Sequence, residues 1–297
     1  MATEPMRRPF FSQEHRHRFQ YVAFLMVAVV IRSLPLEIAS QWSGAVWRLV
    51  APRFHRHRRA LDNLALAFPD KTAREIELIA LKMWENLGRT FAEFFQIDRI
   101  IKSDRIQLEE PESFRLLKSR VGGSVVCSLH MGNWEILSQA AIRIGWSPAG
   151  LYQRMSNPLV GRFVNAVRTP LYPGGLIEKS PKAARSLLRY AREGGCIAFL
   201  ADQRDARGLA TTFFGRPVNS TSFPALAAHA LNTPLYVCRV KRLGAVRFSI
   251  SVEQIEVPRT GDRSADILAA TTSIQSTFES MIREAPDQWM WGQRRWD

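Results

Sequence analysis

The chain has 297 residues, of which 46% are hydrophobic and 23% are charged. This globular composition excludes global disorder and leaves room for one large α/β domain. Its 41 lysines and arginines against 27 acidic residues give a formal net charge of +14, and only 7 of the 41 are lysine. A basic surface of this kind needs an anionic partner, either nucleic acid or an anionic membrane with its substrates.

The three cysteines lie inside apolar, strand-like runs without metal-ligand spacing. We interpret them as small buried residues of a protein from a reducing compartment. They are Cys127, Cys196 and Cys238.

Residues 1–59 contain two apolar helical segments between basic clusters. The first, from Phe19 to Ile31, is shorter than the roughly 20 residues that span a bilayer and lacks a convincing small-residue cleavage site for a signal peptide. The second, from Leu34 to Leu49, repeats apolar residues at helical spacing. Because arginine–histidine clusters flank the pair, we predict a membrane-anchoring region attached to the cytoplasmic leaflet. The alternative is a packed N-terminal helical layer.

Residues 60–297 divide into a helical lead-in (60–120) and an α/β core (121–297). In the lead-in, Thr72-x-x-Glu75 predicts a capping box at the start of a long amphipathic helix. In the core, alternating strand and helix patterns predict a single domain with a central mixed sheet flanked by helices. The strands are expected at 124–129, 148–152, 196–201, 235–240 and 246–252, and the helices at 133–144, 158–168, 181–193, 222–231 and 266–284.

His130 is the main candidate for chemistry. The stretch from Ser124 to Glu135 has the pattern of a buried strand, a Gly-Asn corner and the first turn of a helix, with His130 at the strand end. A neutral imidazole can remove a proton from a hydroxyl if its other nitrogen donates to an acceptor, and Glu135 can reach back to accept. The alternative is a histidine that ends a strand and a glutamate that favours a helix N-terminus.

The remaining histidines are weaker candidates. We interpret His229, within an Ala-Ala-His-Ala helix, as a surface or packing residue. The other four lie in arginine clusters and are interpreted as interfacial; they are His15, His17, His55 and His57.

The sequence lacks the motifs of several enzyme classes. It contains no G-x-S-x-G, G-x-x-x-x-G-K-[ST], G-x-G-x-x-G or H-E-x-x-H, which disfavours a serine hydrolase, a P-loop enzyme, a nicotinamide enzyme and a zincin. Without an obvious protein nucleophile beside His130, the nucleophile is expected to be a hydroxyl of the substrate. Direct acyl transfer fits, because it needs only a base, an oxyanion donor and positioning.

His130-x-x-x-x-Glu135 is similar to the H-x4-D/E signature of the lysophospholipid acyltransferase superfamily. Its surroundings resemble the late acyltransferases of lipid A biosynthesis, which add secondary acyl chains to the Kdo-bearing precursor, and the phosphatidylinositol mannoside acyltransferases share much of the pattern. Two positions depart from it: Gln293 replaces a histidine and Phe223 a common glycine, neither expected to touch His130 and Glu135. The resemblance is carried by residues 63–69, 128–135, 152–154, 157–159, 194–203, 213–215, 289–291 and 294–296.

The resemblance implies roles for five residues. His130 would be the general base and Glu135 its partner, while Asn133, Arg154 and Asp202 would bind substrate. Arg154 would lie near the reacting carbonyl or an acceptor phosphate, and this arginine or backbone amides at the Gly-Asn corner would stabilise the oxyanion. From the residues alone, a solvated loop arginine and a turn-stabilising aspartate remain open as alternatives for Arg154 and Asp202.

The resemblance also implies the partners. The donor would be acyl-acyl carrier protein or acyl-CoA, the acceptor a hydroxyl of a lipid A precursor, and the location the cytoplasmic face of an anionic Gram-negative inner membrane. Neither a metal nor another cofactor is expected. From the residues themselves, the Trp/Arg-rich tail is expected to pack as a C-terminal seal. The alternatives are cation–π pairs at the membrane surface and a contact of Arg294 or Arg295 with lipid phosphate.

Two other functions remain open. One is acylation of a lysophospholipid or of another glycolipid by the same chemistry. The other is a non-enzymatic basic module that binds membranes or nucleic acid, although the sequence contains no recognisable nucleic-acid motif, so no nucleic-acid partner is expected.

Overall fold

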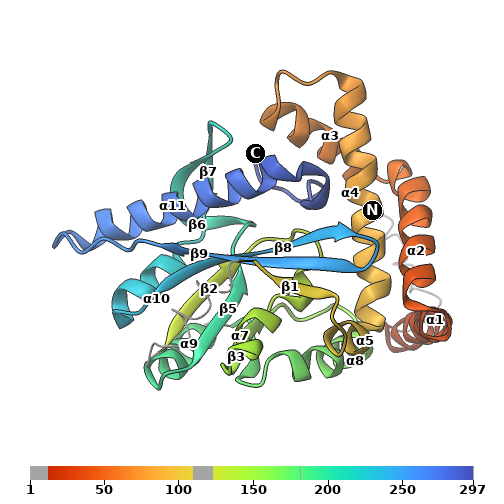
Figure 1. The fold of residues 1–297 in the computed structure, drawn as a ribbon, viewed down its shortest axis with the longest axis horizontal. Helices are drawn as coiled ribbons and strands as arrows, with labels where there is room; N and C mark the ends of the chain where they lie inside the picture. Colours follow the sequence, from red (N-terminus) through yellow and green to blue (C-terminus); the bar gives the residue numbers. More distant parts are fainter. Residues whose placement is uncertain (1–12, 110–122, 181, 297) are drawn as a thin grey trace, which may run out of the picture.

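A mixed seven-stranded sheet lies at the centre of the computed structural model, which describes residues 13–109, 123–180 and 182–296 (Figure 1). The strand order is β1-β9-β8-β2-β5-β3-β4, and every neighbouring pair is parallel except β8 and β9. This confirms the predicted α/β class. The strands are β1 (Ile106–Leu108), β2 (Ser124–Ser128), β3 (Pro148–Tyr152), β4 (Gly175–Glu178), β5 (Cys196–Leu200), β8 (Leu235–Gly244) and β9 (Arg247–Ile255).

A β-hairpin stands where the sequence was interpreted as loops. Strands β6 (Arg204–Phe213) and β7 (Arg216–Ser220) pair in antiparallel fashion as a separate two-stranded sheet. Phe214 and Gly215, the two residues between them, both have positive φ, as a type I′ hairpin turn requires. Half of the ten residues of β6 are exposed and only Thr211 and Phe213 are buried, so β6 lacks the apolar run by which the other strands were found.

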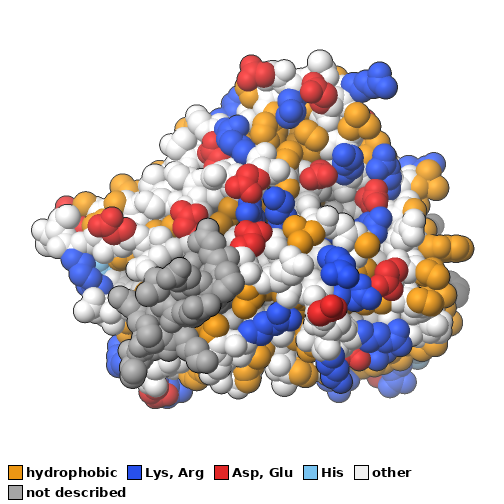
Figure 2. All heavy atoms as spheres, viewed as in Figure 1, with side chains coloured by type: hydrophobic (Ala, Val, Ile, Leu, Met, Phe, Trp, Pro, Cys, Tyr) orange, Lys and Arg blue, Asp and Glu red, His pale blue; other side chains and the backbone are white. Residues whose placement is uncertain are grey.

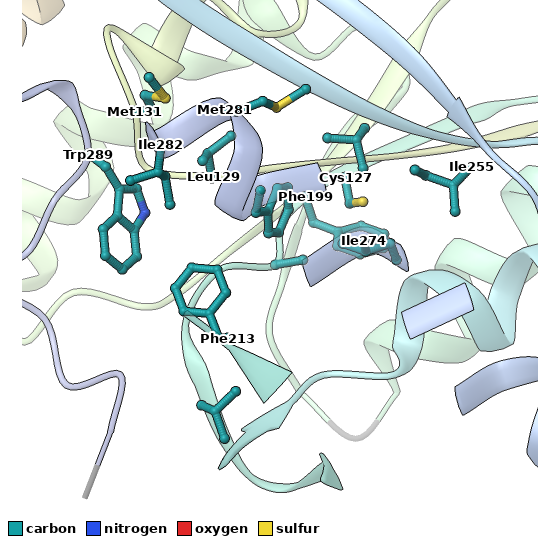
Figure 3. Packing of buried hydrophobic residues seen from close by; sticks show 14 of the residues in the cluster. Cys127, Leu129, Met131, Phe199, Phe213, Ile255, Ile274, Met281, Ile282 and Trp289 are labelled. Carbon is teal, nitrogen blue, oxygen red and sulfur yellow. The ribbon is translucent and has the colours of Figure 1, made fainter. Parts of the chain in front are cut away.

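Helices cover both faces of the large sheet. Alternate residues of β2 point to opposite faces: Val125 and Cys127 pack with α10 and α11, whereas Val126 packs with α7. Figure 3 shows the first of these packing regions, where Cys127 and Leu129 from the sheet side lie near Ile274 and Ile282. The core helices are α7 (Gln139–Arg143), α8 (Pro158–Arg168), α9 (Ala183–Arg192), α10 (Phe223–Leu231) and α11 (Arg263–Glu284).

One expected helix is broken. The segment 133–144 forms a 3₁₀ turn, η2 (Trp134–Ile136), and then the short α7, instead of a continuous helix. The Asn133 side chain accepts a hydrogen bond from the Glu135 backbone N–H at 3.3 Å and so starts the 3₁₀ turn. The single helix predicted here was therefore wrong.

The structure is helical from Gln13 to Ile101, as predicted. The capping box at the start of α4 is present, because Thr72 and Glu75 exchange hydrogen bonds. The domain boundary placed at residues 59–60 falls inside α3. Within the described ranges, no helix combines the length and apolar character that crossing a membrane needs. The helices are α1 (Gln13–Ser33), α2 (Leu36–Val50), α3 (His55–Ala67), α4 (Ala73–Phe95) and α5 (Ile97–Ile101).

All three cysteines are free and buried, as predicted. Burial raises the pKa of the Cys196 thiol to about 12, and it also raises the pKa of Cys127 and Cys238. Because the thiolate is the reactive form, these cysteines are packing residues.

A buried ion pair joins the N-terminal helices to the sheet. Glu93 of α4 is fully buried, and its two carboxylate oxygens accept hydrogen bonds from the two terminal nitrogens of Arg242 on β8, at 2.6 and 2.9 Å. The same carboxylate accepts from Ser40 of α2 at 2.6 Å and from Asn133 at 2.9 Å. Each oxygen of the Glu93 carboxylate therefore accepts two of these hydrogen bonds. Together they link α2, α4, β8 and the corner after β2.

We expect Glu93→Gln to destabilise the protein by about 3–5 kcal/mol, because it leaves the Arg242 guanidinium buried without a counter-charge. Urea unfolding measures the difference. The matched control is Glu85→Gln on the same helix, which breaks partly exposed ion pairs to Arg48 and Arg89 and should cost about 1 kcal/mol or less. Equal costs for the two variants would contradict this account of the buried pair.

Candidate active site

The corner after β2 turns the chain away from the sheet. Gly132 has a φ of +59°, and a Cβ at this position would lie 2.2 Å from the backbone oxygen of Val240, so only glycine fits. Its N–H donates to the Gln288 carbonyl at 3.1 Å. The corner is thus packed between β8 and the C-terminal segment. His130 lies two residues before Gly132, just after the end of β2.

His130 and Asp202 lie opposite each other at the carboxyl ends of two neighbouring parallel strands. In the β2–β5 register Ser128 pairs with Leu200, and each of the two residues lies two positions beyond this pair. The His130 ring Nδ1 lies 2.8 Å from one Asp202 oxygen, and the His130 backbone N–H donates to the other at 2.9 Å. Asp202 is fully buried, whereas the His130 side chain keeps 14% of its surface exposed.

The C-terminal segment completes the surroundings of Asp202. The indole N–H of Trp289 donates to the carboxylate at 2.8 Å and the amide of Gln293 at 3.2 Å. Burial alone would raise the pKa of Asp202, but the charge of His130 and hydrogen bonds from His130 and Trp289 lower this pKa to about 2. Asp202 is therefore a carboxylate at neutral pH.

A carboxylate at Nδ1 fixes the tautomer of the imidazole. Asp202 can only accept, so Nδ1 carries the proton and Nε2 is the basic nitrogen. This is the state that a general base needs, and it matches the arrangement of histidine and aspartate in the Ser-His-Asp triad.

In the described structure Glu135 makes no hydrogen bond to the His130 ring, and Asp202 takes the position at Nδ1 that was expected for Glu135. The Glu135 side chain instead forms a two-point ion pair with Arg168, whose Nε donates to it at 2.8 Å and whose Nη2 donates to the second oxygen. Burial lowers the pKa of the Arg168 guanidinium, but the Glu135 carboxylate outweighs burial and raises this pKa above its usual range. Glu135 points toward Arg168 because it lies in the 3₁₀ turn η2 and not in a continuous α-helix.

The other two expected substrate contacts also have different surroundings. Asn133 is fully buried and its amide donates to Glu93, so it supports the corner and is not open to a ligand. Arg154 is exposed, and its Nε lies 2.9 Å from Glu178, as expected for the alternative of a solvated loop arginine. The Gly132 N–H already donates to Gln288 and is not available to an oxyanion.

A cavity of about 300 Å³ opens beside His130. Its charged groups are Glu135, Arg168 and Lys179, beside the His130 ring, and leucines and aromatic residues supply much of the rest. Sequence reasoning missed Arg168 and Tyr172, which lie at the far end of α8 and just beyond it. The full lining is His130, Trp134, Glu135, Leu137, Leu151, Tyr152, Gln153, Arg168, Tyr172, Leu176, Lys179, Ala198, Phe199, Leu200 and Gln203.

The tail packs as a seal, as predicted. Trp289 and Trp291 are fully buried, and their rings contact each other at 4.6 Å between centroids. Trp289 also contacts Phe213, as Figure 3 shows. The tail is part of the site as well, because Gln293 donates to Asp202.

The low pKa of Asp202 predicts a pH-dependent contribution to stability. A carboxyl whose folded-state pKa lies below its ordinary value of 3.8 stabilises the fold above that value and loses this effect as the pH falls toward 2. Near neutral pH this effect should make the free energy of unfolding of wild type about 2 kcal/mol larger than that of Asp202→Asn. The difference between the two proteins should become smaller below about pH 4. Urea unfolding across this pH range measures it, and a gap independent of pH would contradict the assignment.

Comparison with known protein families identifies the family of the chain. The family of bacterial lipid A biosynthesis acyltransferases matches residues 8–297, which is nearly the whole chain. No curated protein matches it. The chain belongs to the bacterial lipid A biosynthesis acyltransferases and is an enzyme that transfers acyl groups.

Proposed function

We propose that the enzyme moves a fatty acyl chain from an acyl-acyl carrier protein or acyl-CoA thioester to a hydroxyl of a lipid A precursor, with His130 as general base. The observation that carries this proposal is the contact of the His130 Nδ1 with the buried Asp202 carboxylate, at the edge of the cavity. Asp202 takes the orienting role expected of Glu135. It holds the ring and stabilises the imidazolium that forms in the transition state.

In the proposed step, His130 Nε2 removes the proton of the acceptor hydroxyl while its oxygen attacks the thioester carbonyl carbon. A tetrahedral intermediate forms, and its collapse breaks the carbon–sulfur bond. The leaving sulfur takes the proton back from His130, so the products are an ester and a free thiol, and the enzyme returns to its initial state.

Arg168 is the proposed stabiliser of the oxyanion. It lines the same cavity as His130, and its guanidinium is held in place by the two-point ion pair with Glu135. A fixed cation aimed at developing negative charge lowers the barrier without reorganisation. Glu135 thus acts through Arg168 as a positioning residue.

The apolar part of the cavity suits the acyl chain. Leu137, Leu151 and Leu176 line it together with Phe199. Burying methylene groups against such residues is favourable by about 0.8 kcal/mol each. A chain lying there would present its thioester to His130.

We expect His130→Ala to fold and to lose acyl transfer by about 10² or more, as for a lost general base. Asp202→Asn should lower kcat by about 10²–10⁴, because the amide can impose the wrong tautomer on His130. Transfer from acyl-acyl carrier protein to a lipid A precursor, followed by mass spectrometry, measures both effects.

Glu135→Gln should also lower activity, but less than Asp202→Asn, because it weakens the hold on Arg168 and leaves His130 oriented. Full activity of His130→Ala would contradict the mechanism. A larger loss in Glu135→Gln than in Asp202→Asn would contradict the assignment of Asp202 as the orienting acid.

We also propose that α1 and α2 attach the enzyme to the cytoplasmic face of the inner membrane without crossing it. Both helices expose large apolar side chains, and Figure 2 shows hydrophobic atoms along the edge where α1 and α2 lie. An exposed apolar surface of this extent beside basic residues is typical of interfacial helices. The exposed residues are Phe19, Val22, Met26, Val27, Val29, Val30, Ile38, Trp42, Val46, Leu49 and Val50.

The double variant Trp42→Asp/Leu49→Asp should lower binding to vesicles of phosphatidylethanolamine and phosphatidylglycerol by about 10-fold or more, since each large apolar group contributes about 1.5–3 kcal/mol when buried. Vesicle sedimentation measures the binding. The control is Leu268→Asp on α11, where the leucine is 42% exposed. Equal binding of both variants would contradict attachment through α2.

A further inference from the structure

A second cavity, of about 420 Å³, lies next to the cavity beside His130 and is lined largely by arginines. Gln203 lines both cavities, and Gln293, whose amide contacts Asp202, lines the second. We call it the basic cavity. Its polar lining is Arg56, Arg59, Gln203, Arg204, Gln293 and Arg294.

Three arginines of the basic cavity, Arg56, Arg59 and Arg294, have no acidic partner in the part of the chain that the structure describes. Within the described part of the chain, no Asp or Glu lines this cavity. Over the same residues Arg56, Arg59 and Arg294 have no ion pair; Arg59 donates one hydrogen bond, to the Gly292 carbonyl at 3.4 Å. Like charges around one cavity repel, so this arrangement destabilises the free protein unless an anion is bound.

The position of Arg56 on its helix adds to this unfavourable charge. Arg56 lies in the first turn of α3, where no acidic residue is present. The N-terminus of a helix carries partial positive charge, which disfavours cations there and favours anions. The arginine-rich start of α3 is therefore poor for helix stability and suited to binding an anion.

The basic cavity is held in shape by buried contacts. His57, between the arginines of α3, accepts from the Trp84 indole at 3.0 Å, and its other nitrogen lies 3.3 Å from Glu77. Asn63 donates to the carbonyls of Trp291 and Gln293 at 2.8 and 3.0 Å. These contacts fix α3 to α4 and to the tail, so the arginines are preorganised. His57 is buried, so its interpretation as an interfacial residue was wrong.

On this basis, and resting on the proposed function, we infer that the basic cavity binds a phosphate group of the acceptor lipid. Guanidinium groups bind phosphate through paired, charge-assisted hydrogen bonds. The cavity adjoins the catalytic pair through Gln203 and Gln293, so a bound phosphate would hold the acceptor sugar within reach of His130.

The membrane geometry favours the acceptor over the donor as the source of this phosphate. The exposed apolar residues of α2 end at Val50, and exposed Phe54 directly precedes α3. If these residues enter the bilayer, Arg56 and Arg59 lie at the level of the lipid headgroups. A lipid acceptor carries its phosphates at that level, whereas a donor carrier arrives from the aqueous side.

The test uses the full chain with Arg56→Gln/Arg59→Gln and, as matched control, Arg58→Gln, an exposed arginine on the same helix that does not line the cavity. Binding is measured in a His130→Ala background, so no turnover is needed. The probes are detergent-solubilised bis-phosphorylated lipid A precursor and the same lipid treated with phosphatase.

We expect the double variant to raise the Kd for the phosphorylated lipid by about 10-fold or more, as for lost hydrogen bonds to a charged group, and to leave the Kd for the dephosphorylated lipid unchanged. Arg58→Gln should change neither Kd by more than about twofold. The thermal midpoint of the double variant should be equal to or above that of wild type, because repulsion is relieved. Arg294→Gln, from the tail, is a second variant with the same expected direction if the double variant does not fold.

Equal Kd values for the double variant and Arg58→Gln would overturn the inference. In the active enzyme, a rise in KM for acyl-acyl carrier protein or acyl-CoA without a rise for the acceptor would also overturn it and would assign the cavity to the donor. Failure of the proposed function is separate: the enzyme would then transfer no acyl chain to this lipid, while the binding measurement would still report on the cavity.

Discussion

The buried carboxylate of Asp202 is the constraint on which the active site depends. A carboxylate removed from water needs its lone pairs satisfied, and here the donors come from two distant parts of the chain: His130 after β2, and Trp289 with Gln293 in the C-terminal tail. The carboxyl ends of β2 and β5 and the C-terminal segment must therefore meet before the site exists. This explains why a tail distant in sequence belongs to the same site as the strand-end histidine.

Much of the fold could be predicted from sequence pattern. Buried parallel strands such as β2 and β5 are continuous apolar runs, and the Asn157-Pro158 start and Arg168 end of α8 follow known capping preferences. The hairpin β6–β7 could not be predicted this way, because it is stabilised by a turn with two positive φ values and not by an apolar stripe. The helix expected at 133–144 failed because the N–H groups of Ile136, Leu137 and Ala140 donate to carbonyls three residues earlier, which gives a 3₁₀ turn instead of a continuous α-helix.

The site was predicted in part. His130 could be identified because it follows a buried strand and lies outside the arginine clusters. Its partner could not be identified from spacing along one segment: Glu135 is near in sequence, whereas Asp202 is near through the β2–β5 register. A signal was present, since both His130 and Asp202 come two residues after buried apolar strands, and parallel neighbours bring such positions together. What sequence could not supply is that these two strands are neighbours.

The central claim is that Asp202, and not Glu135, sets the tautomer of His130. The most direct measurement is the ¹H–¹⁵N NMR spectrum of the His130 ring in the folded enzyme at neutral pH. The account predicts a hydrogen-bonded proton on Nδ1 and an unprotonated Nε2, a signal that is lost in Asp202→Asn and kept in Glu135→Gln. A proton on Nε2, or a signal that depends on Glu135 and not on Asp202, would contradict it.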